Sequence, residues 1–307
     1  MIYKNSNSNS NLNNKINSKI LVTGGAGFIG SHLCEKLSKL GFEVFSIDNY
    51  STGSRDNHVE NVTYVEGMTK DIEILINFRP DIVYHLGEYS RVEKSFDDIG
   101  KVWSYNKDGI FPVLQFCRKN QSKLIYAGSS TKFADGGLGR SQSPYAWTKA
   151  SNADLIENYA NWFGINYAIV YFYNVYGGRE ISHGKYATLI ALFIEQYRNG
   201  EPLTVVSPGT QLRNFTHIDD IISGLIIVGE RGEGDNYGIG SSESFSVLDI
   251  VKMFDSKFKM LPERKGNRMT ADVISTKTEA LGWKPTRTVK EYIEENERII
   301  GSHNATN

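Results

Sequence analysis

A glycine-rich stretch directly after the first apolar run constrains most strongly how this chain of 307 residues can fold. Ile20-Leu21-Val22 is a short run of strand-forming residues, GGAGFIG follows at residues 24–30, and residues 28–40 continue with the apolar spacing of a helix. A strand that passes through closely spaced glycines into a helix is typical of the first βα turn of a parallel sheet. One glycine permits the tight turn, another lets the backbone approach a ligand, and the last lets helix and strand pack closely.

Short apolar runs continue to alternate with helical patterns through the first 175 residues. Such alternation predicts a parallel sheet covered by helices on both faces, and right-handed crossovers make it a doubly wound α/β sheet of the Rossmann type. After about residue 175 the strands are shorter and glycine-flanked, and we expect a smaller mixed α/β portion at the carboxyl edge of the sheet. The expected strands are residues 20–22, 43–47, 62–65, 81–84, 123–126 and 167–171, and the expected helices are residues 28–40, 102–118, 145–163, 186–198, 219–229, 247–254 and 289–300.

The glycine turn and an acidic residue beyond it predict a dinucleotide cofactor. The first helix would present free N–H groups and a partial positive charge to a pyrophosphate. Asp48 ends the second strand at about the 20-residue offset at which a carboxylate binds the adenosine ribose. Its charge repels a 2′-phosphate, so NAD is favoured over NADP. The residues expected beside the pyrophosphate are Gly24, Gly27, Phe28, Ile29 and Gly30.

The composition argues against several other classes of protein. Lys and Arg number 34 and Asp and Glu number 35, and a formal net charge of −1 argues against a nucleic-acid partner. No apolar run approaches the roughly 18–20 residues that span a bilayer, so we expect no membrane partner. Two cysteines without a CxxC or His-rich cluster predict neither a disulfide framework nor a metal site. A reducing, cytoplasmic setting fits this cysteine usage.

We expect three segments along the chain. Residues 1–18 are mostly Asn and Ser, and such a stretch cannot bury enough apolar surface to offset its ordering entropy, which predicts a disordered leader. Residues 19–175 are expected to form the NAD-binding Rossmann domain. Residues 176–307 are expected to be mainly a substrate-binding portion, with some return of the chain to the Rossmann domain.

A tyrosine and a lysine one helical turn apart predict general acid–base chemistry. Tyr145 and Lys149 share one face of a helix, and Pro144 suits the start of that helix. A free tyrosine has a pKa of about 10 and is a poor base at neutral pH. An adjacent ammonium and a bound nicotinamide cation favour the phenolate. Upstream, IYAGSST at residues 125–131 is a strand that runs into a hydroxyl-rich turn, and a hydroxyl there can share the substrate oxygen with Tyr145.

Together these motifs resemble the extended short-chain dehydrogenase/reductase family, in its branch of UDP-glucose 4-epimerase-like nucleotide-sugar epimerases and dehydratases. The resemblance covers residues 19–298 and is far more specific for fold and cofactor than for substrate. It is carried by GGAGFIG (24–30), DNYSTG (48–53), HLGEYSRVEKS (85–95), SST (129–131), SPYAWTK (143–149), YFYNVYG (171–177), GTQLRNFTHIDD (209–220) and LGWKP (281–285).

The resemblance also implies roles for individual residues. Ser129 would be the catalytic hydroxyl residue, Tyr145 the acid/base and Lys149 its partner and a contact of the nicotinamide ribose. Arginine suits a diphosphate because its planar fork donates paired hydrogen bonds. Further cofactor contacts would be Asn49, Met68, Thr69, Leu86, Gly87 and Asn106, and substrate contacts would be Glu88, Ser129, Ser130, Phe172, Asn174, Thr188, Arg213 and Arg264.

Departures from the family pattern bear on the reaction. Dehydratases and decarboxylases of this branch usually carry an acidic residue just after the catalytic hydroxyl residue, where this chain has Ser130 and Thr131. We therefore expect an NAD-dependent nucleotide-sugar 4-epimerase that oxidises C4 transiently to a 4-keto intermediate. Glu88, which replaces a small residue of the family motif, keeps a 4,6-dehydratase open by offering a carboxylate. A nucleotide-sugar 4-dehydrogenase or ketoreductase and a non-catalytic NAD-binding regulator are further alternatives.

The family also implies a homodimer, in which the helices over residues 102–118 and 145–163 pair with their copies as a four-helix bundle. Apolar residues on both helices permit this pairing, although a buried core face would have the same pattern. The residues in question are Val102, Tyr105, Ile110, Val113, Leu155, Ile156 and Tyr159. A nucleotide-diphosphate sugar is the expected small-molecule partner.

Overall fold

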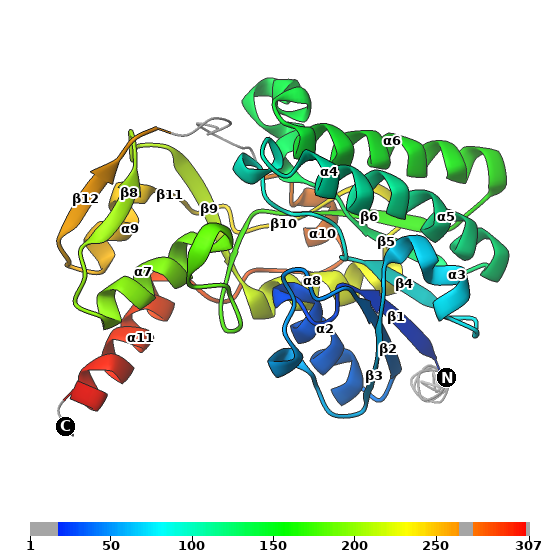
Figure 1. Ribbon diagram of the computed structural model, residues 1–307, viewed down its shortest axis with the longest axis horizontal. Helices are drawn as coiled ribbons and strands as arrows, with labels where there is room; N and C mark the ends of the chain where they lie inside the picture. Colours follow the sequence, from blue (N-terminus) through cyan, green and yellow to red (C-terminus); the bar gives the residue numbers. More distant parts are fainter. Residues whose placement is uncertain (1–17, 264–272, 305–307) are drawn as a thin grey trace, which may run out of the picture.

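The structure, a computed structural model, describes residues 18–263 and 273–304. At its centre lies a sheet of seven parallel strands with helices on both faces (Figure 1), which confirms the predicted doubly wound Rossmann sheet. The strand order is β3-β2-β1-β4-β5-β6-β10, so the direction of winding reverses between β1 and β4, where such sheets bind their ligands. The strands are β1 (Lys19–Thr23), β2 (Glu43–Asp48), β3 (Val62–Glu66), β4 (Ile82–His85), β5 (Lys123–Ala127), β6 (Tyr167–Phe172) and β10 (Gly234–Ile239).

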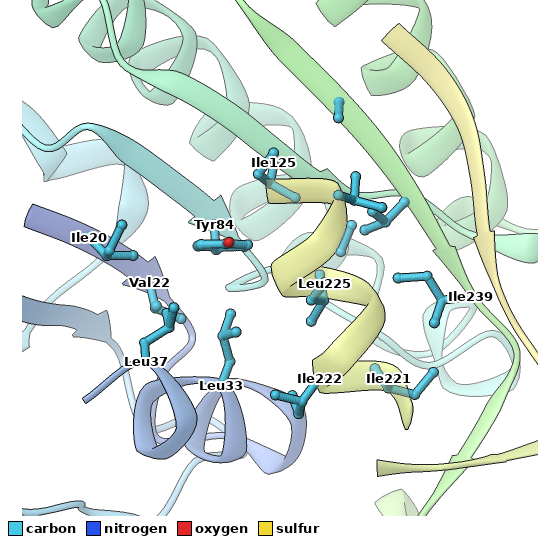
Figure 2. Packing of buried hydrophobic residues seen from close by; sticks show 14 of the residues in the cluster. Ile20, Val22, Leu33, Leu37, Tyr84, Ile125, Ile221, Ile222, Leu225 and Ile239 are labelled. Carbon is cyan, nitrogen blue, oxygen red and sulfur yellow. The ribbon is translucent and has the colours of Figure 1, made fainter. Parts of the chain in front are cut away.

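Alternate side chains of the central strands enter two different cores, one on each face of the sheet. Ile20 and Val22 cluster with Leu33 and Leu225 from two helices on one face, seen from close by in Figure 2. Leu21, between them in the sequence, belongs to the cluster on the other face. Burying a side chain of this size contributes about 1.5–3 kcal/mol, so both faces need a cover. One face carries α2 (Phe28–Lys39) and α8 (Ile218–Arg231), and the other carries α3 (Ile72–Leu75), α5 (Asp108–Asn120) and α6 (Pro144–Phe163).

The helix expected over residues 102–118 is interrupted. It consists of α4 (Ile99–Val102), a π-helical turn (Trp103–Lys107) and then α5. Pro112 lies inside α5 and lacks the N–H that would bond to the carbonyl of residue 108, so the helix is weakened just where the wider turn ends. Apolar periodicity predicts the helix but carries no signal for this turn.

The C-terminal part of the chain forms two small sheets and returns to the large one. Its core gathers apolar residues of α7 (Leu189–Arg198), α9 (Val247–Met253) and α11 (Val289–Asn304). The helix expected from residue 186 begins at Leu189, because Gly184–Tyr186 is a 3-10 turn and extended backbone follows it. α8 and β10 rejoin the large sheet. The remaining elements are β7 (Asn174–Tyr176), β9 (Leu212–His217) and β11 (Ser244–Ser246) in one sheet, β8 (Leu203–Val206) and β12 (Phe258–Leu261) in the other, and α10 (Thr276–Glu279).

Within residues 18–263 and 273–304, no helix is both long enough and apolar enough to cross a membrane. The predicted leader over residues 1–18 lies outside the described residues, apart from Ser18.

Candidate active site

A cavity of about 610 Å³ lies at the carboxyl edge of the large sheet, where the turns after β1, β2, β4, β5 and β6 meet. Nearly all the residues predicted to bind cofactor or substrate line it. Asn106 does not line the cavity, and Arg264 lies outside the described residues. The predicted residues that line it are Gly24, Gly27, Phe28, Ile29, Gly30, Asp48, Asn49, Met68, Thr69, Leu86, Gly87, Glu88, Ser129, Ser130, Tyr145, Lys149, Phe172, Asn174, Thr188 and Arg213.

In the glycine turn after β1, backbone atoms pack so closely around Gly24 and Gly30 that a side chain has no room there. Gly24 has φ +77°, and a Cβ on it would lie 2.8 Å from Gly87 Cα. A Cβ on Gly30 would overlap the carbonyl oxygen of Gly24. Gly27 differs, because a Cβ there would meet only that same oxygen, at 3.2 Å. Gly27 is also the N-cap of α2 and offers no side chain to the first N–H groups, which leaves them for an anion in the cavity.

Asp48 is fixed by its own turn. Its Oδ2 accepts a hydrogen bond from Ala26 N at 2.9 Å, and its Oδ1 accepts one from Tyr50 N at 2.8 Å. Burial raises the pKa of Asp48 despite these bonds. Each carboxylate oxygen has a second lone pair, so ribose hydroxyls can donate to it as well. Next to it, Asn49 Nδ2 donates to Met68 Sδ at 3.1 Å, which links the turn after β2 to the turn after β3.

Tyr145 is placed at the start of α6 by a well-capped helix terminus. Ser143 is the N-cap, and its hydroxyl accepts a hydrogen bond from Ala146 N at 3.1 Å, while Pro144 occupies the first helical position. Such a cap contributes about 1 kcal/mol and fixes the entry of the chain into the helix. Tyr145 therefore lines the cavity from the first turn of a 20-residue helix, a rigid support for an acid–base group.

Ser129 lies two residues after β5 and caps the short turn that follows. Its hydroxyl accepts a hydrogen bond from Thr131 N and lies 2.8 Å from the Thr131 hydroxyl. Ser130 and Thr131 are buried with it. The turn after β5 therefore offers hydroxyl groups to the cavity, and no carboxylate follows Ser129 at these two positions.

Lys149 is held by Glu88, which the sequence analysis predicts as a substrate contact and which here lines the cavity beside the lysine. Lys149 Nζ donates to Glu88 Oε2 at 2.6 Å and to the carbonyl of Ala127 at 2.5 Å. Burial alone would raise the pKa of Glu88, but the ammonium and the nearby His85 ring outweigh it and hold that pKa well below its usual value. Although Glu88 borders the cavity, its carboxylate is turned into the protein and ionised there.

Asn106 is fully buried in the π-helical turn and links two elements that line the cavity. Its Oδ1 accepts a hydrogen bond from Tyr89 N at 2.8 Å, and its Nδ2 donates to Thr148 Oγ1 at 3.0 Å. It thus ties the loop after β4 to α6. The predicted direct contact with the cofactor does not fit this position, because both ends of the amide are bound to protein.

The residues expected at the substrate come from the C-terminal part of the chain. Arg213 lies on β9 and donates to the carbonyl of Leu212 at 2.8 Å. Asn174 Nδ2 donates to the carbonyl of Asn214 at 3.1 Å. Thr188 precedes α7. Three separate elements thus reach the same cavity from the side opposite the glycine turn.

Arg91 is a cavity residue that sequence reasoning missed. Its Nε and Nη2 donate to the carbonyl of Tyr186, at 3.1 and 2.7 Å. Burial lowers its pKa, but an arginine remains a cation at neutral pH. The residue belongs to the HLGEYSRVEKS motif, yet no spacing rule assigns it a ligand. Among residues 18–263 and 273–304, no cluster of three or more His, Cys, Asp or Glu side chains is placed to hold a metal ion.

Comparison with known proteins agrees with this geometry. Residues 20–240 match the family described as the NAD dependent epimerase/dehydratase family. The chain is 30% identical to a putative UDP-glucose 4-epimerase of Methanocaldococcus jannaschii, over 94% of this chain and 100% of the relative. It is 29% identical to UDP-glucuronic acid decarboxylase 6 of Arabidopsis thaliana, over 90% and 86% of the two chains.

A solved structure of a relative carries both kinds of ligand. It is the UDP-glucuronic acid 4-epimerase of Bacillus cereus in complex with UDP-glucuronic acid and NAD. Its TM-score to this chain is 0.81 at 26% identity, with 92% of this chain and 99% of the other covered. The turn of Gly24, Gly27 and Gly30 and the carboxylate of Asp48, which line one cavity, fit the same cofactor. This chain is therefore an NAD-dependent enzyme of the epimerase/dehydratase family.

Proposed function

We propose that the chain is a nucleotide-sugar 4-epimerase that oxidises the C4 carbon of its substrate transiently. The observation that supports the proposal is that Ser129, Tyr145 and Lys149 line the same cavity as the glycine turn. The hydroxyl residues Ser130 and Thr131 stand where a lyase of this family would place a carboxylate. The cofactor's pyrophosphate would bind at the glycine turn and its adenosine ribose at Asp48.

Each residue has a defined task in this reaction. When bound, NAD supplies reversible oxidation of an alcohol carbon. Tyr145 takes the proton of the C4 hydroxyl and later returns it, while Ser129 donates a hydrogen bond to the same oxygen. Lys149 favours the phenolate and has one N–H left for the nicotinamide ribose, since Glu88 and Ala127 take two.

The C-terminal part of the chain would hold the nucleotide while the sugar turns. Arg213 and Asn174, which line the cavity, would bind the diphosphate, so the 4-keto sugar could present its other face without leaving. Confinement in a cavity of about 610 Å³ limits access of water to the reactive ketone.

A 4,6-dehydratase is less well supported. Dehydration needs a proton removed from C5 and another delivered to the departing C6 oxygen, work that suits free carboxylates. The carboxylate that the sequence offered for this task is that of Glu88, and it is engaged with Lys149, Tyr126 and Asn152.

The test is a product analysis with UDP-, dTDP-, GDP- and CDP-sugars. An epimerase changes the stereochemistry seen by NMR and leaves the mass unchanged. Loss of water would indicate a dehydratase, loss of carbon dioxide a decarboxylase, and stoichiometric NADH a dehydrogenase. Tyr145→Phe should lose nearly all turnover and retain NAD. Tyr159→Phe, on the same helix but bonded to Gln115, is the matched control and should keep its turnover.

We also propose that two copies pair through the outer face of α4, α5 and α6. Most of the apolar residues expected at this interface instead lie inside one chain. Ile110, Val113, Ile156 and Tyr159 are buried in the core against the sheet, and Val102 is buried against Tyr89 and Tyr145. Large aromatic side chains lie on the outer face instead, and two of them, Trp103 and Trp147, stack with ring centroids 5.9 Å apart. The exposed aromatic residues in the segment from α4 to α6 are Trp103, Phe111, Trp147, Trp162 and Phe163.

A further inference from the structure

Glu88 forms a buried ion pair with the lysine that the proposed reaction needs beside its acid–base tyrosine. Glu88 Oε2 lies 2.6 Å from Lys149 Nζ, and the two side chains are only 1% and 5% exposed. Tyr126 donates to the same oxygen at 2.8 Å, and Asn152 Nδ2 donates to Oε1 at 3.0 Å. A small residue is usual at this place in the family that the chain resembles, so the counter-ion is a departure by this chain.

His85 at the end of β4 completes the surroundings of the carboxylate. Its Nε2 lies 3.4 Å from Glu88 Oε1, and its Nδ1 lies 2.7 Å from the hydroxyl of Thr23. That hydroxyl also accepts a hydrogen bond from Gly87 N at 3.0 Å, whereas His85 Nε2 is buried without a hydrogen-bond partner of its own. Oε2 of Glu88 accepts hydrogen bonds from α6 and β5, and Oε1 accepts one from α6, which offsets much of the desolvation of the charge.

Other titratable groups surround the pair and Tyr145. Lys107, in the π-helical turn, lies close enough to be affected by the charge of Glu88. Arg91 and Tyr126 lie close enough to be affected by a charge on Tyr145. Burial raises the pKa of Tyr126 well above its usual value, so Tyr126 stays a neutral donor. Arg91 is thus one cation near Tyr145, and Lys149, one turn further along α6, is the second; Glu88 is bonded to Lys149.

We propose that Glu88 is a positioning residue that holds Lys149 in place and, as its counter-ion, weakens the effect of the ammonium on the ionisation of Tyr145. The inference rests on the proposed function, which assigns acid–base work to Tyr145. A lysine without a counter-ion would stabilise the phenolate more strongly. Glu88 therefore sets the pH range in which this chain's Tyr145 can accept a proton, and it does so without touching the substrate.

The test follows the ionisation of Tyr145 itself, as phenolate absorbance against pH in the purified protein without substrate. The same titration of Tyr145→Phe identifies its contribution. Glu88→Gln keeps the shape of the side chain and an acceptor for Lys149 but removes the charge. We expect the midpoint to fall by about one pH unit. Asp235→Asn is the control, since it removes a carboxylate paired with Lys132 at 2.5 Å outside the cavity and should leave the midpoint unchanged.

An unchanged midpoint in Glu88→Gln would overturn the proposal and leave Glu88 a purely structural residue. If this variant does not fold, Glu88→Gln combined with Lys149→Met removes both charges and leaves no unpaired buried ion. We expect this double variant to titrate near the unsubstituted protein, because the two charges oppose each other at Tyr145. A midpoint higher by one pH unit or more would mean that Glu88 does not weaken the effect of Lys149 on the ionisation of Tyr145, and it would contradict the proposal. None of these titrations needs a sugar nucleotide, so failure of the 4-epimerase assay is a separate result.

Discussion

Replacing single glycines of the turn after β1 separates cofactor binding from folding. In Gly27→Ala the new methyl group would meet only the carbonyl oxygen of Gly24, at 3.2 Å, and φ −81° suits any residue. Alanine is a poorer N-cap than glycine by about 0.5–1 kcal/mol, so the protein should still fold. The methyl group would stand where a pyrophosphate has to approach the backbone. Overlap of this kind costs about 1–3 kcal/mol, which raises the Kd for NAD by a factor of about 5 to 150.

Thermal unfolding with and without NAD measures both effects. NAD at 100 times its Kd stabilises the protein by about 2.7 kcal/mol, and after a 100-fold rise in Kd the same concentration contributes about 0.4 kcal/mol. In Gly27→Ala the increase in Tm on adding NAD should therefore nearly vanish, while Tm without NAD changes little. An undiminished NAD response would refute the assignment of this backbone to the pyrophosphate.

Gly30→Ala is the matched variant. Its Cβ would overlap the carbonyl oxygen of Gly24 and lie 2.9 Å from Gly25 Cα, and backbone atoms in a closed turn cannot move aside singly. The turn has to open, so this variant should be destabilised by about 3 kcal/mol even without NAD. A Gly30→Ala protein as stable as the parent would mean that the turn tolerates a side chain and that its glycines are not required by packing.

Two further variants test a buried carboxyl group and the proposed assembly. Burial raises the pKa of Glu180 from 4.5 to about 7. Between these two pH values the folded protein binds a proton that the unfolded chain has lost. The free energy of unfolding should therefore fall by about 3 kcal/mol as the pH rises from 4.5 to about 7. Glu180→Gln keeps an acceptor for Gly177 N and should abolish this fall in stability, which urea unfolding at pH 5 and pH 8 measures. If the free energy of unfolding of the variant fell equally steeply, another group would be the cause. Trp103→Glu should convert a dimer into a monomer in sedimentation, whereas an unchanged mass would place any interface elsewhere.

The parts of the site that follow local rules could be predicted from the sequence. The glycine turn depends on a strand, a spacing of glycines and a helix, all contiguous in the chain. Asp48 follows from an offset along the same unit, and Tyr145 and Lys149 follow from the pitch of one helix. Parallel strands place their carboxyl ends at one edge, which is why residues distant in sequence, such as Gly24 and Ser129, line one cavity.

Orientation of side chains between elements could not be predicted in this way. The apolar residues of α5 and α6 fit a core face and an interface face equally well, and only the packed structure shows that Ile110 and Ile156 face the core while Trp103 and Trp147 do not. Asn106 was expected at the cofactor, but its helix widens by a π turn that periodicity does not register. Arg91 was missed because its contact, the carbonyl of Tyr186, lies 95 positions away in the chain.

For Glu88, the position follows from the sequence, but the partners of its side chain follow only from the packing of the elements. The sequence places it at the end of a strand beside the nicotinamide site, and a carboxylate there is equally compatible with a catalytic group, a sugar contact or an ion pair. The choice among them depends on β5 and α6, which supply Tyr126, Lys149 and Asn152. A carboxylate cannot be buried at this depth without such partners, because the desolvation of an unpaired charge amounts to several kcal/mol. Once Lys149 is required by the acid–base chemistry and the loop after β4 carries a glutamate, the ion pair is the arrangement that leaves neither charge isolated, and the ionisation of Tyr145 has to adjust to it.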